Sequence, residues 1–120
     1  MNLRSVDTYL ETLWDWSFLN DCFGHTRIRV TDIDGVVERN GHFLYIETKS
    51  PGASIPQGQA LMFEALTRQP NSHVLIIWGE PNMPEKAQFW GKAAFSADAA
   101  VIRSLVKRWF AYANEQKGNQ

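Results

Sequence analysis

Asn40-Gly41 stands between two runs with the composition of β-strands, and this arrangement restricts the possible folds more than any other part of the sequence. Residues 28–38 and 42–49 are rich in β-branched and aromatic side chains, and Asn-Gly readily adopts the positive φ angles of a two-residue hairpin turn. The two runs are therefore predicted to pair as an antiparallel hairpin. Neither face of the second run is clearly polar, so it is predicted to be a central strand.

The rest of the chain alternates between helical and strand-like patterns. Three helices are predicted, over 6–14, from Ser54 (a capping box with Gln57) to about Arg68, and from Asp98 to about Asn114. Two further strands are predicted over His73–Trp78 and Lys86–Lys92, between the second and third helices. Trp16–Gly24 is predicted to be an irregular aromatic-rich connection between the first helix and the hairpin. The last helix carries its apolar stripe at positions 102, 105, 106, 109, 110 and 113. This order predicts an α/β (α+β) fold with a central mixed β-sheet flanked by helices.

Composition limits the broad class of protein. The chain has 120 residues, 12 basic and 13 acidic side chains and 44% hydrophobic residues, which predicts one soluble domain over 1–120 with a frayed tail at about 115–120. This balance excludes a disordered chain and a histone-like polycation. No apolar run is long enough to span a membrane, no signal peptide is evident, and Cys22 has no disulfide partner. The predicted location is therefore cytoplasmic.

Acidic and basic side chains are predicted to meet at the end of the hairpin away from its turn. Asp34 and Glu47 are equally far from Asn40-Gly41, so antiparallel pairing makes them neighbours, with Asp32 close by and Lys49 on the same face as Glu47. Crowded carboxylates repel one another, and a divalent cation such as Mg²⁺ neutralises them. A neighbouring lysine can hold a phosphate. These are the components of metal-assisted phosphodiester hydrolysis.

The motif formed by a strand-borne Asp, a Glu-x-Lys about a dozen residues later and a following glutamine helix resembles the PD-(D/E)XK nuclease superfamily, over Asp32 to about Gln59. That group includes restriction endonucleases, Holliday junction resolvases and RecB-type exonucleases, and the short chain looks like its small phage-encoded members. The resemblance implies a restriction-endonuclease-like core and a Mg²⁺- or Mn²⁺-dependent deoxyribonuclease. It implies that Asp34, Glu47 and the Thr48 carbonyl bind the metal and that Lys49 is catalytic.

Some assignments within the motif stay open. Asp32 is an alternative to Asp34, which the hairpin register favours. Gln59, with Phe63 four residues later, looks like the glutamine helix of the RecB-type members, and Gln57 is the alternative. Many resolvase-like members also carry a glutamate on the first helix, for which Glu11 is the candidate.

Two other functions are compatible with parts of the sequence. Asp32-Ile33-Asp34-Gly35 also resembles the first motif of haloacid-dehalogenase-like phosphatases, in which the first Asp is the nucleophile. The second alternative is a non-catalytic oligomeric binding module in which Glu47 and Lys49 form a structural ion pair.

The net charge of −1 requires a nuclease of this size to concentrate its basic side chains on one face. The residues predicted to contact DNA are Lys49, Arg68, Lys86 and Lys92. A homodimer is expected, because one small domain offers little surface for extended contact with DNA. Crowding further predicts that at least one carboxyl pKa is raised, and that Asp34→Asn melts no lower than wild type in EDTA.

Overall fold

A computed structural model describes residues 12–116, and the chain divides into two compact units, Met1–Asp32 and Ile33–Gln120. In the first unit, the segment predicted to be irregular forms a 3₁₀ helix, η1 (Trp16–Phe23), which corrects the prediction. Asp15 explains the helix, because its carboxylate accepts a hydrogen bond from the backbone N–H of Ser17 at 2.9 Å and caps the N-terminus. The helix expected over 6–14 lies outside the described residues except for its last positions, and 13–15 are not helical.

The second unit is built on a five-stranded mixed sheet with strand order β1-β2-β3-β4-β5. β2 and β3 run parallel at its centre, and every other neighbouring pair is antiparallel. The predicted α+β fold with a central mixed sheet is therefore confirmed. The strands are β1 (Gly35–Arg39), β2 (His42–Lys49), β3 (Ser72–Glu80), β4 (Met83–Phe89) and β5 (Phe95–Ser96).

The β1–β2 hairpin has the predicted turn and register. Asn40 and Gly41 have φ angles of 53° and 80°, and Gly35 pairs with Ile46. β2 has the bounds that the sequence predicts, but β1 is much shorter than the expected 28–38. β1 begins after Asp34 because the Asp34 carboxylate accepts the hydrogen bond of the Thr48 N–H. In a longer β1, the backbone carbonyl of the residue before Asp34 would accept that bond.

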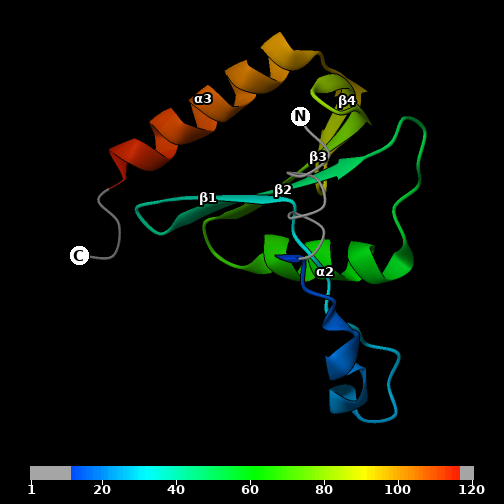
Figure 1. Ribbon diagram of the computed structural model, residues 1–120. Helices are drawn as coiled ribbons and strands as arrows, with labels where there is room; N and C mark the ends of the chain where they lie inside the picture. The colour runs from blue at the N-terminus through cyan, green and yellow to red at the C-terminus, as the bar shows by residue number, and fades with distance from the viewer. Residues whose placement is uncertain (1–11, 117–120) are drawn as a thin grey trace. The chain divides into compact units, whose positions relative to one another are not determined.

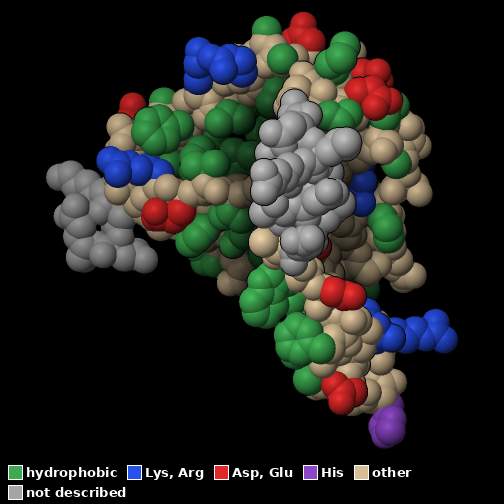
Figure 2. Space-filling model, viewed as in Figure 1, with side chains coloured by type: hydrophobic (Ala, Val, Ile, Leu, Met, Phe, Trp, Pro, Cys, Tyr) green, Lys and Arg blue, Asp and Glu red, His purple; other side chains and the backbone are tan. Residues whose placement is uncertain are grey.

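Helices cover both faces of the sheet: α2 (Gln57–Arg68) lies on one side and α3 (Ala99–Glu115) on the other (Figure 1). Under α2, Phe63 packs against Val74, Ile76 and Trp78. The space-filling view shows hydrophobic side chains in the hollow between α3 and the hairpin (Figure 2). The buried residues on the α3 side are Leu44, Leu75, Ala87, Ala97, Trp109 and Ala113.

The helix boundaries agree with the sequence, but some details differ. α2 has Pro56 at its N-cap and no side-chain cap, so the predicted Ser54 capping box is wrong. Asp98 does cap α3, accepting from the Val101 N–H at 3.0 Å. Phe110, assigned to the apolar stripe, is 47% exposed. β4 begins and ends three residues earlier than the predicted strand 86–92, and β5, with only two residues, is too short to predict from periodicity.

The hairpin turn is joined to the end of α3. The Asn40 side-chain amide donates to the carbonyls of Ala113 and Gln116 at 3.1 and 2.6 Å, and Arg39 donates to the Asn114 side chain at 2.8 Å. The last carbonyls of a helix have no partners within it, so Asn40 supplies donors that the helix lacks. Among the described residues, no helix is both long and apolar enough to cross a membrane.

Candidate active site

Asp34 and Glu47 come together where β1 begins and β2 ends. The ladder extends to Gly35 and Ile46, and the next pair along it is Asp34 with Glu47. Glu47 lies on the face that α2 covers, as does Tyr45 two residues earlier, and it is only 7% exposed. A carboxylate this deeply buried needs compensating partners, because burial penalises the charged form.

Asp34 is held in place by Thr48. Its Oδ2 atom accepts hydrogen bonds from both the backbone N–H and the hydroxyl of Thr48, each at 2.8 Å. The N–H and carbonyl of a residue in an antiparallel strand face the same neighbouring strand. The Thr48 carbonyl is therefore on the Asp34 side of β2. A carbonyl that binds the same metal ion as Asp34 has to lie on that side.

The two carboxyl groups have opposite pKa shifts. Burial raises the pKa of Glu47, and the charge and hydrogen bonding of neighbouring Asp34 raise it further, against the opposing effects of Lys49 and Gln59. Burial also acts to raise the pKa of Asp34, but hydrogen bonds from Thr48 and Glu47 and the charge of Lys49 outweigh it, so this pKa is lowered. The prediction that one carboxyl pKa is raised is confirmed, and the residue concerned is Glu47.

Lys49 and Gln59 complete the cluster. Lys49 is close enough to both carboxylates to affect their pKa values, and Gln59, on the first turn of α2, hydrogen bonds to Glu47. Gln57 is exposed. Among the described residues, Glu47 Oε2 and Gln59 Oε1 are buried acceptor atoms without a hydrogen-bond partner. A buried acceptor without a donor is unfavourable, and a cation would satisfy it.

The chain turns away from the site immediately after Lys49. Ala53 N–H donates to the Ser50 carbonyl at 3.0 Å, and the turn between them contains Pro51 and Gly52, whose φ is 72°. The indole of Trp78 donates to the Ala53 carbonyl at 2.7 Å and fixes the loop. This loop leads directly into α2 and so sets the position of Gln59.

The predicted DNA contacts divide between the two ends of the sheet. Lys49, Trp78 and Lys86 are cross-strand neighbours on one face, and the Lys86 ammonium lies 4.4 Å from the centre of the Trp78 ring. Lys86 is therefore near the carboxylates. Arg68, at the far end of α2, is 4.0 Å from Glu64, and Lys92 follows the end of β4.

The other candidate carboxylates are not part of the described cluster. Asp32 belongs to the first unit, where its Oδ1 atom accepts from the Trp16 indole at 2.8 Å. Glu11 lies outside the described residues. Among the described residues of the second unit, the cluster contains two carboxylates, Asp34 and Glu47, and no group of three Asp, Glu, His or Cys side chains.

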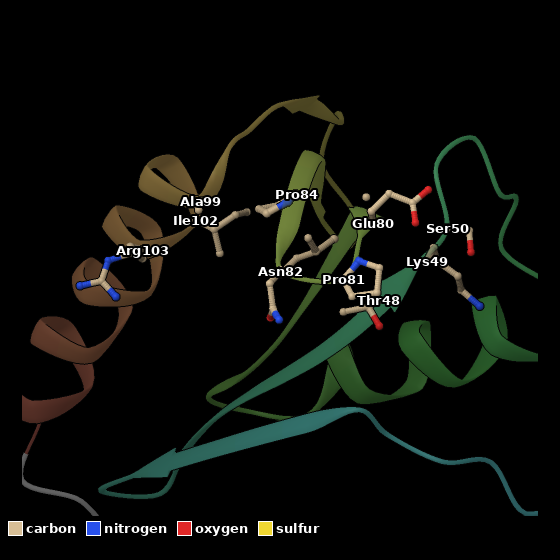
Figure 3. A pocket seen from close by; sticks show the side chains of 12 residues that line it. Thr48, Lys49, Ser50, Glu80, Pro81, Asn82, Pro84, Ala99, Ile102 and Arg103 are labelled. Atoms are coloured by element: carbon tan, nitrogen blue, oxygen red, sulfur yellow. The ribbon is translucent and has the colours of Figure 1, made fainter. Parts of the chain in front are cut away.

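A cleft of about 620 Å³ borders the cluster on the α3 side of β2. In Figure 3, Thr48 lies beside the cleft, while the Lys49 side chain extends away from Arg103 toward the α2 side. Its lining includes Ile77 and Ile102, and the cleft leaves open space next to the end of β2.

The residues of the cluster fit a hard divalent cation. Mg²⁺ is commonly held by one or two carboxylates together with water and substrate phosphate oxygens. Asp34 and Glu47 supply the two carboxylates, and the Thr48 carbonyl is on the same side of β2. The buried Glu47 oxygen, which has no hydrogen-bond partner among the described residues, is compatible with this chemistry, because a carboxylate oxygen can bind a hard cation.

Comparisons with protein-family models, with curated proteins and with solved structures found no match to this chain. The resemblance to PD-(D/E)XK nucleases therefore rests on the residues of the motif. The five-stranded mixed sheet establishes the α+β class and does not by itself identify a restriction-endonuclease-like core.

Two contacts of the site were not predicted from the sequence. Thr48 was predicted for its carbonyl alone, although its N–H and hydroxyl hold Asp34. The pairing of Trp78 with Lys49 was not predicted, because the parallel register that aligns them depends on the loop and helix between the strands. The threonine hydroxyl between Glu47 and Lys49 could have indicated the contact with Asp34. No local pattern could have indicated that Trp78 lies beside Lys49.

Proposed function

We propose that this protein is a metal-dependent nuclease that hydrolyses phosphodiester bonds of DNA. The observation that carries the proposal is the meeting of Asp34, Glu47 and Lys49 at the end of β2, with Gln59 against Glu47. Two neighbouring carboxylates and buried acceptors without partners among the described residues would be stabilised by a divalent cation, and Lys49 supplies an ammonium group beside them. These groups are what cation-assisted phosphodiester chemistry requires.

Each side chain has a distinct part in this proposal. Asp34 and Glu47, with the Thr48 carbonyl, would bind Mg²⁺ or Mn²⁺. When bound, the cation would supply charge neutralisation and water activation. Lys49 would hold the scissile phosphate and stabilise the charge that develops on it. Gln59 would orient Glu47, and Thr48 would orient Asp34.

The phosphatase alternative has no comparable support. Its motif requires the first Asp at the end of a strand, but residues 27–33 form no strand and β1 begins only after Asp34. The binding-module alternative explains Lys49 as an ion-pair partner of Glu47, yet it leaves the buried Glu47 oxygen without a partner.

The experiment is an incubation of supercoiled plasmid and of branched DNA with the purified protein, in Mg²⁺, in Mn²⁺ and in EDTA. We expect cleavage with either metal and none in EDTA. Glu47→Gln should remove the activity, because it replaces a ligand charge while keeping the shape of the side chain. Cleavage that persists undiminished in EDTA, or in Glu47→Gln, would contradict the proposed mechanism.

A further inference from the structure

A second cavity, of about 810 Å³, lies at the end of the sheet opposite the carboxylate cluster. Four elements surround it: the end of α2, the start of β3, the turn after β4 and the second half of α3. Along β3, Ser72 at the cavity and Trp78 near the cluster are separated by about 20 Å, at roughly 3.3 Å per residue. The cavity is therefore separate from the proposed active site.

Two aromatic rings on the wall of the cavity are fixed by neighbours. The Trp90 indole donates to Glu64 at 2.8 Å, and its ring meets Phe63 edge to face at 5.4 Å. Tyr112 meets the buried ring of His42 in the same way at 5.5 Å. Rings held in this manner lose little conformational freedom when a flat group stacks on them.

The charged side chains on the cavity wall are basic, and the Glu64 carboxylate that accepts from Trp90 lies outside the lining. Lys92 and Arg108 line the cavity, and none of the described residues that line it is acidic. Burial, with the charge of His42, lowers the pKa of His73, which disfavours a positive charge on this ring. Thr67 Oγ1 and Trp109 Nε1, from two further lining residues, are buried and have no hydrogen-bond partner among the described residues.

Aromatic faces combined with cations and without carboxylates are the features that bind single-stranded nucleic acid, because bases stack on the rings and the phosphates pair with the cations. We propose that this cavity binds an unpaired nucleotide of a single-stranded segment, with its base on Trp90 or Tyr112 and its phosphate at Lys92 and Arg108. The link between this cavity and a DNA substrate rests on the proposed function. If both hold, the substrate of the nuclease is DNA with an unpaired segment.

The test measures binding separately from cleavage. A 5′-labelled twelve-nucleotide oligothymidylate is titrated with protein in EDTA, and fluorescence anisotropy gives the Kd. We expect Tyr112→Ala, which removes an exposed ring, to bind about fivefold or more weakly. We expect the double variant Lys92→Ala/Arg108→Ala to bind at least tenfold more weakly, with a smaller dependence of Kd on salt.

Lys107→Ala is the matched control, because Lys107 is an exposed lysine of α3 that does not line the cavity. It should bind as wild type does. Thermal melts establish that each variant is folded, and Tyr112→Ala keeps the test decisive should the double variant unfold. The proposal is overturned if wild type does not bind the oligonucleotide, if the cavity variants bind it as wild type does, or if they weaken blunt duplex binding equally.

Glu47→Gln separates this inference from the proposed function. It should bind the oligonucleotide normally although it cannot cleave DNA. An inactive wild-type protein that still loses oligonucleotide binding in the cavity variants would refute the nuclease and retain the nucleotide site. If wild type cleaves DNA but the cavity variants bind the oligonucleotide as wild type does, the nuclease is retained and the nucleotide site is refuted.

Discussion

The two ends of the central strands β2 and β3 carry different chemistry. Among the described residues, the buried side-chain atoms without a hydrogen-bond partner at one end are acceptors of Glu47 and Gln59. At the other end they are the Trp109 indole N–H, which is a donor, with Thr67 Oγ1 and His42 Nδ1. The first end has two carboxylates beside Lys49 and the Lys86–Trp78 pair, whereas the described residues that line the cavity at the second end include cations and aromatic rings and none that is acidic. Under the proposed function, the carboxylates at one end would bind a cation and the cavity at the other end would bind a nucleotide phosphate.

The largest effect that sharpens this comparison is expected from Lys49→Ala. Loss of the ammonium removes the group that stabilises charge on the phosphate, so cleavage should fall by about 100-fold or more. Plasmid cleavage in Mg²⁺ measures the rate. Lys107→Ala is the control and should cleave at the wild-type rate, and thermal melts should show that both variants are folded. Wild-type activity in Lys49→Ala would show that Lys49 has no catalytic role.

The two carboxylates should respond oppositely to neutralisation in EDTA. Asp34→Asn weakens two hydrogen bonds from Thr48 and should lower stability by about 1 kcal/mol, which reverses the expectation from sequence alone. Glu47→Gln removes a buried charge of raised pKa and should melt at the same temperature or higher. Both variants should gain less from Mg²⁺ than wild type does. Thermal melts with and without Mg²⁺ give all of these values, and an equal Mg²⁺ gain in Asp34→Asn would make Asp34 structural only.

The pH dependence of stability in EDTA should identify Glu47. Its pKa is raised on folding, so its stabilising contribution is present at low pH and is lost as pH rises through the folded-state pKa. Glu47→Gln lacks this loss. The melting temperature of the variant relative to wild type should therefore rise by a few degrees between about pH 4 and 7. Asp34, with a lowered pKa, loses its contribution as pH falls instead. A difference between wild type and Glu47→Gln that stays constant with pH would contradict the shift.

The smallest expected effect concerns the Thr48 hydroxyl. Thr48→Val keeps the shape and the backbone N–H but removes one of the two donors to Asp34, and should cost about 0.5–1 kcal/mol in EDTA. The Mg²⁺-induced rise in melting temperature should also decrease, since Asp34 is less firmly oriented. Thr48→Ser retains the hydroxyl and should behave as wild type. Identical melts for the Val and Ser variants would show that the backbone N–H alone positions Asp34.

Sequence reasoning succeeded where the determinants are local. Asn40-Gly41 fixes the turn, and the turn fixes the register that places Asp34 beside Glu47. It failed where a contact depends on distant segments. The strand expected over 28–38 has a suitable composition, but the carboxylate of Asp34 ends the ladder. The second cavity combines residues of four elements, whose arrangement no local pattern encodes.

Asn40 has a kinetic consequence, because its backbone forms a turn and its side chain caps a helix more than seventy residues later. The turn forms within microseconds from neighbouring residues, whereas the cap requires closure of nearly the whole second unit. Contacts made after the folding transition state mainly govern the rate of unfolding. Asn40→Gly keeps a turn-compatible backbone and deletes only the cap, so it should accelerate unfolding while leaving refolding almost unchanged.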